Sequence, residues 1–136
     1  MFVARAPGKL VALGEYAVLD GAPALVLALD RYAEARVAVS DDGACHLEMR
    51  AADTVRLRFA PGAPSGAGLI DLVAAAANPP LAWRATVAST AFFEGTANLG
   101  LGSRAAVLCP WAGPLAAYAR AAGRAVPQPT LPGLVE

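Results

Sequence analysis

The sequence has little of several residue types that would point to a function directly. Among its 136 residues are one lysine, Lys9, one histidine, His46, and no excess of either charge, because eleven basic residues balance eleven acidic ones. A nucleic-acid surface normally carries an excess of positive charge. The neutral balance therefore argues against a nucleic-acid partner.

Cysteine is also too scarce to suggest a metal centre. Cys45 and Cys109 lie far apart in the chain, and His46 is the only other metal-ligand residue type beside either of them. A zinc site needs three or four ligands, so we expect no metal held by such a cluster. We interpret both cysteines as buried thiols in a reducing compartment, which predicts a cytoplasmic location.

Long apolar runs are missing, although 57% of the residues are hydrophobic. The run at residues 22–29 is interrupted by Pro23 and is shorter than the roughly 20 residues that cross a bilayer. The first five residues lack the basic-then-apolar order of a secretory signal. We therefore expect no membrane partner.

The pattern along the chain predicts strands first and helices mostly later. Pro7-Gly8 predicts a turn, and Asp41-Asp42-Gly43 predicts a hairpin, because Asp-Gly supplies the positive φ angles of a tight turn. This order is typical of an α+β fold with a largely antiparallel sheet. The expected strands are residues 2–6, 24–40, 45–50, 54–59 and 83–89, and the expected helices are 67–77, ended by residues 78–80, and 103–122.

The most informative segment is Asn98-Leu99-Gly100-Leu101-Gly102-Ser103-Arg104-Ala105-Ala106. Two glycines one residue apart let the backbone bend sharply and approach a ligand. A helix that begins here would direct its N-terminal amides and its dipole toward an anion. The segment therefore predicts a phosphate-binding loop.

Two common phosphate loops fit this segment poorly. A Walker A loop needs a lysine after its last glycine, and none is present. The dinucleotide fingerprint matches at Gly100, Gly102 and Ala105, but it also needs an acidic residue about 20 positions later. No Asp or Glu stands between Glu94 and Glu136, so an oxidoreductase that binds NAD is disfavoured.

A third interpretation uses both ends of the chain. Residues 6–19, Ala-Pro-Gly-Lys-Leu-Val-Ala-Leu-Gly-Glu-Tyr-Ala-Val-Leu, resemble the first motif of the GHMP kinases, and residues 99–106 resemble their second motif, the ATP phosphate loop. The Gly-Glu-Tyr form is most similar to phosphomevalonate and mevalonate kinases. The resemblance implies a two-layer α+β fold with helices packed on one face of the sheet. It also implies that residues 1–136 are an N-terminal ATP-binding domain and that the C-terminal domain is absent.

The resemblance also implies a function and a set of site residues. The function is ATP-dependent phosphoryl transfer to mevalonate or phosphomevalonate in isoprenoid biosynthesis, with ATP and Mg²⁺ as cofactors. Lys9 would be the catalytic cation, and Glu15 and Tyr16 would bind the small-molecule substrate. The ATP-binding residues would be Asn98, Gly100, Leu101, Gly102, Ser103, Arg104 and Ala105.

The chain departs from the family pattern in ways that predict low activity. Arg104 replaces a serine associated with magnesium, and a guanidinium has no lone pair for a metal. Pro110 and Pro114 would kink or break the following helix at about 3 kcal/mol each. Family members are about twice as long. We therefore expect an N-terminal fragment that is inactive alone, or a non-catalytic interaction module that self-associates through the face left by the missing domain.

Overall fold

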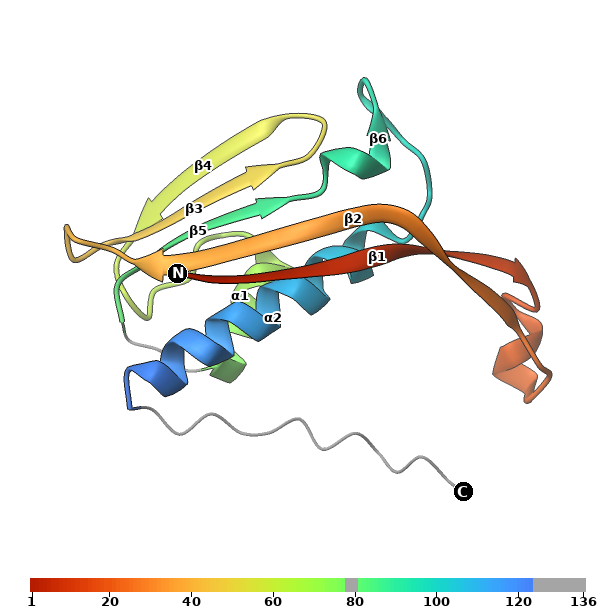
Figure 1. Ribbon diagram of the computed structural model, residues 1–136, viewed down its shortest axis with the longest axis horizontal. Helices are drawn as coiled ribbons and strands as arrows, with labels where there is room; N and C mark the ends of the chain where they lie inside the picture. Colours follow the sequence, from red (N-terminus) through yellow and green to blue (C-terminus); the bar gives the residue numbers. More distant parts are fainter. Residues whose placement is uncertain (78–80, 124–136) are drawn as a thin grey trace.

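The centre of the structure, a computed structural model that describes residues 1–77 and 81–123, is a five-stranded sheet. The order of its strands is β1-β2-β5-β3-β4, with two helices on one side (Figure 1). The α+β fold and the one-sided helical layer are confirmed. The strands are β1 (Phe2–Leu13), β2 (Leu25–Val39), β3 (Cys45–Arg50), β4 (Thr54–Phe59) and β5 (Trp83–Ala88), and the helices are α1 (Gly68–Ala77) and α2 (Ser103–Ala121).

Shorter elements connect these parts. The 3₁₀ helix η1 (Ala17–Asp20) lies between β1 and β2. The 3₁₀ helix η2 (Thr90–Phe92) and the small hairpin of β6 (Phe93–Glu94) and β7 (Ala97–Asn98) lead from β5 to α2. The expected helix stop at residues 78–80 and the tail at residues 124–136 lie outside the described residues.

The sheet is largely antiparallel, with one parallel pair. β1 pairs with β2, β2 with β5, and β3 with β4 in antiparallel register, whereas β3 runs parallel to β5. The hairpin prediction at residues 41–43 is therefore wrong in its pairing, because β5 lies between β2 and β3. A turn does form there: Gly43 has a φ of 72°, and the Asp42 carboxylate accepts hydrogen bonds from Ser40 Oγ and the Ala44 N–H.

The predicted turn at Pro7-Gly8 is also wrong, since β1 continues through it to Leu13. The partner of Pro7 on β2 is Tyr32, but the partner of Gly8 is Leu29, so two residues of β2 bulge out at this point. Extra residues in one strand bend it locally and increase its twist. Beyond the bulge, residues 8–13 and 25–29 form a two-stranded arm that projects past the helices (Figure 1).

Helix α2 packs across β1 and β2 and runs unbroken through both of its prolines (Figure 1). The expected break at Pro110 and Pro114 is wrong. Both prolines are buried, and they share the inward side of the helix with Trp111, Leu115 and Tyr118. Burial of this apolar stripe against the sheet offsets the lost backbone hydrogen bonds.

The core between the sheet and the helices is centred on two tryptophans. The Trp83 and Trp111 rings meet edge to face with centroids 5.3 Å apart, and the Trp111 indole N–H donates a hydrogen bond to the Ile70 carbonyl oxygen over 3.2 Å. The Tyr118 hydroxyl donates to the Ala82 carbonyl oxygen over 2.8 Å. These bonds tie α1, α2 and the residue before β5 together.

Candidate functional site

The glycine loop at residues 99–102 lies against the middle of β1, next to Lys9. The Lys9 N–H donates a hydrogen bond to the Leu101 carbonyl oxygen over 3.0 Å. Lys9 is an exposed residue, and its side chain passes beside Gly102. The structure thus brings the two sequence motifs into direct contact, at the point where α2 begins.

Two glycines make this contact possible. Gly102 has a φ of 74°, and a Cβ on it would lie 2.9 Å from Lys9 Cγ. A Cβ on Gly8 would overlap a ring carbon of Phe92 and would lie 3.1 Å from the Leu101 carbonyl oxygen. Side chains at either position would push the loop away from β1. The glycines are therefore needed for the close approach of two backbones.

Asn98 fixes the shape of the loop from within. Its Oδ1 accepts a hydrogen bond from the Gly100 N–H over 2.9 Å, and its Nδ2 donates to Ser103 Oγ over 3.2 Å. One side chain thus joins the start of the loop to the first residue of α2. The Gly100 N–H is occupied by this bond, so the amides left for an anion are those nearer the helix. The sequence pattern placed Asn98 in the loop but did not reveal this bridging contact.

The first turn of α2 supplies positive electrostatic potential to the same place. The N-terminus of a helix carries a partial positive charge, and Arg104 adds an exposed guanidinium in its first turn. No acidic residue stands in that turn. Arg104 and the helix terminus therefore favour an anion at the start of α2, and the Lys9 side chain passes beside Gly102 at the same end of the helix.

A cavity of about 520 Å³ opens beside the loop. Asn98, Ser103 and Arg104 form part of its wall, and most of the remaining wall is apolar. Cavities of this size and character commonly bind small molecules. The remaining wall residues come from five segments of the chain: Met49, Arg50, Ala51, Ala67, Gly68, Ile70, Val87, Ser89, Phe93, Val107 and Leu108.

Glu15 and Tyr16 lie apart from this cluster. They immediately precede η1 at the end of the arm, whereas the loop lies where the arm joins the body of the sheet (Figure 1). Both are exposed, Tyr16 to 79%, and neither lines the cavity beside the loop. Among the described residues, therefore, Lys9 and the loop come together without the expected substrate-binding pair.

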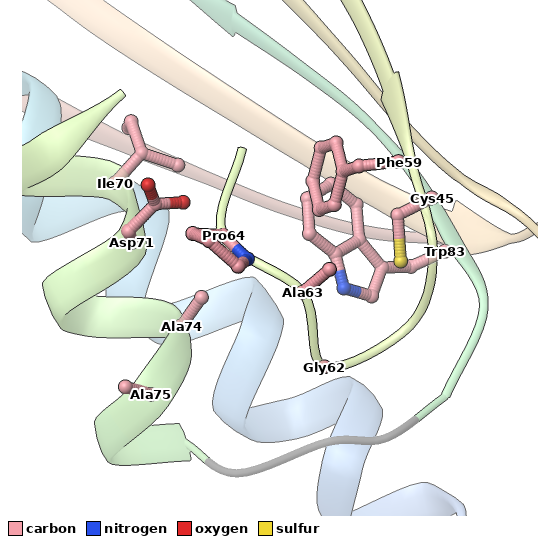
Figure 2. A pocket seen from close by; sticks show the side chains of 10 residues that line it. All are labelled: Cys45, Phe59, Gly62, Ala63, Pro64, Ile70, Asp71, Ala74, Ala75 and Trp83. Atoms are coloured by element: carbon pink, nitrogen blue, oxygen red, sulfur yellow. The ribbon is translucent and has the colours of Figure 1, made fainter. Parts of the chain in front are cut away.

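A second cavity, of about 360 Å³, lies between α1 and the edge of the sheet, away from the loop (Figure 2). Cys45, Phe59 and Trp83 form one wall, and α1 forms the other. Burial raises the pKa of the Cys45 thiol, which donates a weak hydrogen bond to the Leu81 carbonyl oxygen. This thiol is therefore neutral and poorly nucleophilic. The interpretation of both cysteines as buried is wrong for Cys109, which is exposed.

The donors around the loop do not suit Mg²⁺. Magnesium prefers carboxylate and other oxygen ligands, whereas the first turn of α2 presents Arg104, which has no lone pair to offer. In the described part of the chain, no three His, Cys, Asp or Glu side chains gather to hold a metal ion. None of the described helices is long and apolar enough to span a membrane.

Comparison with known proteins finds similarity in structure only. No protein-family model and no curated protein matches the sequence. The Streptococcus pneumoniae phosphomevalonate kinase, solved in complex with phosphomevalonate and AMPPNP, aligns with a TM-score of 0.66 and 20% identity over 93% of this chain and 39% of that one. The Methanococcus jannaschii mevalonate kinase aligns with a TM-score of 0.64 and 14% identity over 86% of this chain and 40% of that one.

A further mevalonate kinase structure aligns with a TM-score of 0.63 and 16% identity, over 93% of this chain and 42% of that one. The chain thus spans about two fifths of the length of these solved kinases. At such low identity the likeness establishes the fold alone. The expected resemblance is confirmed at this level: the chain has the fold of a part of the GHMP kinases, as seen in phosphomevalonate and mevalonate kinases.

Proposed function

We propose that this chain binds the triphosphate of ATP at residues 98–105 and is the nucleotide-binding part of a phosphotransferase that acts on mevalonate or phosphomevalonate. The observation that carries the proposal is the contact between Lys9 and the glycine loop at the N-terminus of α2. Phosphoryl transfer depends mostly on positioning and on neutralising charge. A loop, a helix terminus and a lysine in contact supply both.

Each part of the site has a distinct role in this proposal. The amides of Leu101, Gly102 and Ser103 surround the phosphates, and Arg104 forms a direct ion pair with them. The Lys9 ammonium, a compact point charge, lies next to the transferred phosphoryl group and acts as the catalytic cation. The cavity beside Asn98 and Ser103 receives the nucleoside, because it is largely apolar and adjoins the loop.

Binding is tested with AMPPNP by isothermal titration calorimetry on the 136-residue chain. We expect measurable binding that Lys9→Met weakens about tenfold, which is the effect of one charge-assisted contact. The affinity for AMPPNP should be similar in EDTA and in excess Mg²⁺. The reason is that Arg104 offers a guanidinium where a metal site would offer an oxygen ligand, so the phosphates pair with Arg104. Absence of heat from a folded protein would exclude the proposed ATP site.

Catalysis is tested separately with a coupled assay on mevalonate and on phosphomevalonate. We expect little or no turnover from this chain alone, since it spans about two fifths of the kinases that it resembles and its Glu15 and Tyr16 lie away from the loop. Binding without turnover is the result expected of an ATP-binding part. Robust turnover would show that these residues complete an active site, contrary to our expectation.

A second candidate, a non-catalytic module that self-associates in the cytoplasm, is favoured by one observation. The arm and η1 expose several large apolar side chains, among them Leu13 at 68%, Leu19 at 80% and Leu25 at 51%. Exposed apolar patches commonly mark interaction sites. We expect analytical ultracentrifugation to show a concentration-dependent dimer that the double substitution Leu13→Ser and Leu25→Ser dissociates. A monomer at every concentration would contradict this candidate.

A further inference from the structure

The side of the sheet that faces away from the helices carries a concentration of arginine. The pairing register places Arg5 of β1, Arg36 of β2 and Arg84 of β5 on this side, together with three arginines of β3 and β4. We call this set of six the arginine face; its members are Arg5, Arg36, Arg50, Arg56, Arg58 and Arg84. Six of the ten arginines in the sequence therefore lie on one side of one sheet.

The carboxylates on this side are too few to neutralise it. Glu34 pairs with Arg5 and Arg36, and Glu48 pairs with Arg50 and Arg56. Asp42 accepts from His46 and lies 3.6 Å from Arg58. Each carboxylate is thus shared between two cationic or potentially cationic side chains, and six arginines face three acids.

Arg84 lies in the middle of this face. Its register partners are Ala38 on one side and His46 on the other, and no ion pair joins it to an acid of the described residues. A hollow of about 310 Å³ lies here, with Arg56, Arg84 and Thr86 in its wall. The whole chain has no net charge, so the excess positive charge of this face is balanced by an excess of acidic residues elsewhere. The net charge of the chain therefore does not reveal the positive charge of this face.

We propose that the arginine face binds an acidic, extended segment of a partner protein. Arg56 and Arg58 stand two residues apart on β4, which is about 6.7 Å along a strand, and an extended peptide with alternating acidic residues has the same spacing. Arginine is enriched at protein interfaces and pairs with carboxylates through two parallel hydrogen bonds. The shared carboxylates of Glu34 and Glu48 hold the guanidinium groups in place and leave further N–H donors for a partner.

The composition of the face favours a protein over the other polyanions. Single-stranded nucleic acid is held by aromatic side chains on which bases stack, but the outward residues of β3, β4 and β5 include no Phe, Tyr or Trp. Tyr32, at the margin, already has Arg5 over its ring at 4.8 Å. A membrane surface is favoured by large apolar and aromatic anchors beside the basic residues, and the centre of this face has charged and small side chains instead.

The test uses the full 136-residue chain and a fluorescein-labelled peptide of alternating Glu and Ser, followed by fluorescence anisotropy. We expect binding that weakens with added salt. The double substitution Arg56→Gln and Arg84→Gln should weaken it about tenfold, as expected for charges that contact the partner. The matched control is Arg120→Gln, which removes an exposed arginine of α2 on the other side of the sheet and should leave the affinity unchanged.

A substitution with the opposite sign keeps the test independent of any loss of folding. Glu48→Gln releases Arg50 and Arg56 from their shared acid, so it should tighten peptide binding. Equal weakening by Arg120→Gln and by the double substitution, or weaker binding of Glu48→Gln, would overturn the proposal. So would tighter binding of single-stranded RNA or of phosphatidylserine vesicles than of the peptide, which would assign the face to those ligands.

Discussion

The backbone N–H of Lys9 donates a hydrogen bond to the carbonyl oxygen of Leu101 over 3.0 Å. This bond links a strand at the start of the chain to the loop that precedes α2. Because the bond uses backbone atoms, it fixes the distance between the two motifs whatever the side chain of residue 9. The backbone of residue 9 and the amides at the helix N-terminus are thereby held side by side before any ligand arrives, which reduces the entropy lost on binding.

Alanine at Gly102 should disrupt this contact more than alanine at Gly100. Both glycines have a positive φ, 74° and 71°, so either substitution costs about 1–2 kcal/mol of backbone strain. A Cβ on Gly102 also meets Lys9 Cγ at 2.9 Å, whereas nothing lies within 4 Å of one on Gly100. We expect Gly102→Ala to weaken AMPPNP binding about tenfold more than Gly100→Ala, by calorimetry. Equal losses would mean that strain alone matters.

The sequence predicted elements whose signals are local. The ranges expected for β3 and β4, residues 45–50 and 54–59, are the observed ones, and the helix expected over 103–122 ends at Ala121, just before Gly123 with its φ of 75°. The glycine loop before α2 could be located in the sequence for the same reason, because two glycines followed by a small hydroxyl residue form a local pattern. Each of these features depends on a few neighbouring residues, and the structure preserves it.

The order of the strands was not predictable in the same way. The turn at residues 41–43 reverses the chain, but no local signal shows that β5, which comes much later, enters between β2 and β3. The prolines of α2 misled for a related reason, since their local cost is offset by burial against a sheet that the helix sequence does not reveal. The bridging contact of Asn98 depends on the loop conformation itself and had no sequence signal.

Aspartate at position 98 should weaken nucleotide binding. Asn98→Asp keeps the acceptor for the Gly100 N–H, but it removes the donor to Ser103 Oγ and places a negative charge beside the proposed phosphate site. We expect about a tenfold loss of AMPPNP affinity in calorimetry. The control is Thr96→Asp, which adds the same charge on the exposed turn between β6 and β7 and should have a much smaller effect. Similar losses in both would point to general repulsion and not to the loop clamp.

The Asp71 carboxylate should make stability depend on acid pH. Burial acts to raise its pKa, but the hydroxyl and N–H of Ser65 and the N–H of Gly66 donate to the carboxylate and hold the pKa below its usual value. A lowered pKa in the folded state stabilises the fold above the unfolded pKa of about 4, and this contribution is lost as pH falls through the folded pKa.

Asp71→Asn should therefore cost about 1 kcal/mol at neutral pH, comparable to loss of a helix cap. The difference from the unsubstituted protein should shrink as the pH falls below about 4. Urea unfolding at a series of pH values measures this difference in the free energy of unfolding. The control is Asp53→Asn, because Asp53 is an exposed aspartate in the turn between β3 and β4. A difference that stays constant with pH would show that the charge of Asp71 is not involved.

Alanine in place of Pro114 should raise the thermal stability of the chain. The substitution restores a helical N–H, and proline costs about 3 kcal/mol relative to alanine inside a helix. It also removes two buried ring carbons, worth about 0.8 kcal/mol each, so a net gain of about 1 kcal/mol is expected. Pro61→Ala, in the loop after β4, is the matched control. It should lower stability slightly, because it increases the conformational entropy of the unfolded chain.

The two substitutions thus predict opposite shifts of the melting temperature, measured by circular dichroism at the helical minimum. A lower melting temperature for Pro114→Ala would mean that the buried ring contributes more than the missing hydrogen bond costs. In that case the packing of α2 on β1 and β2 would stabilise the helix by more than the proline destabilises it. The proline would then support the fixed position of the loop at the N-terminus of the same helix.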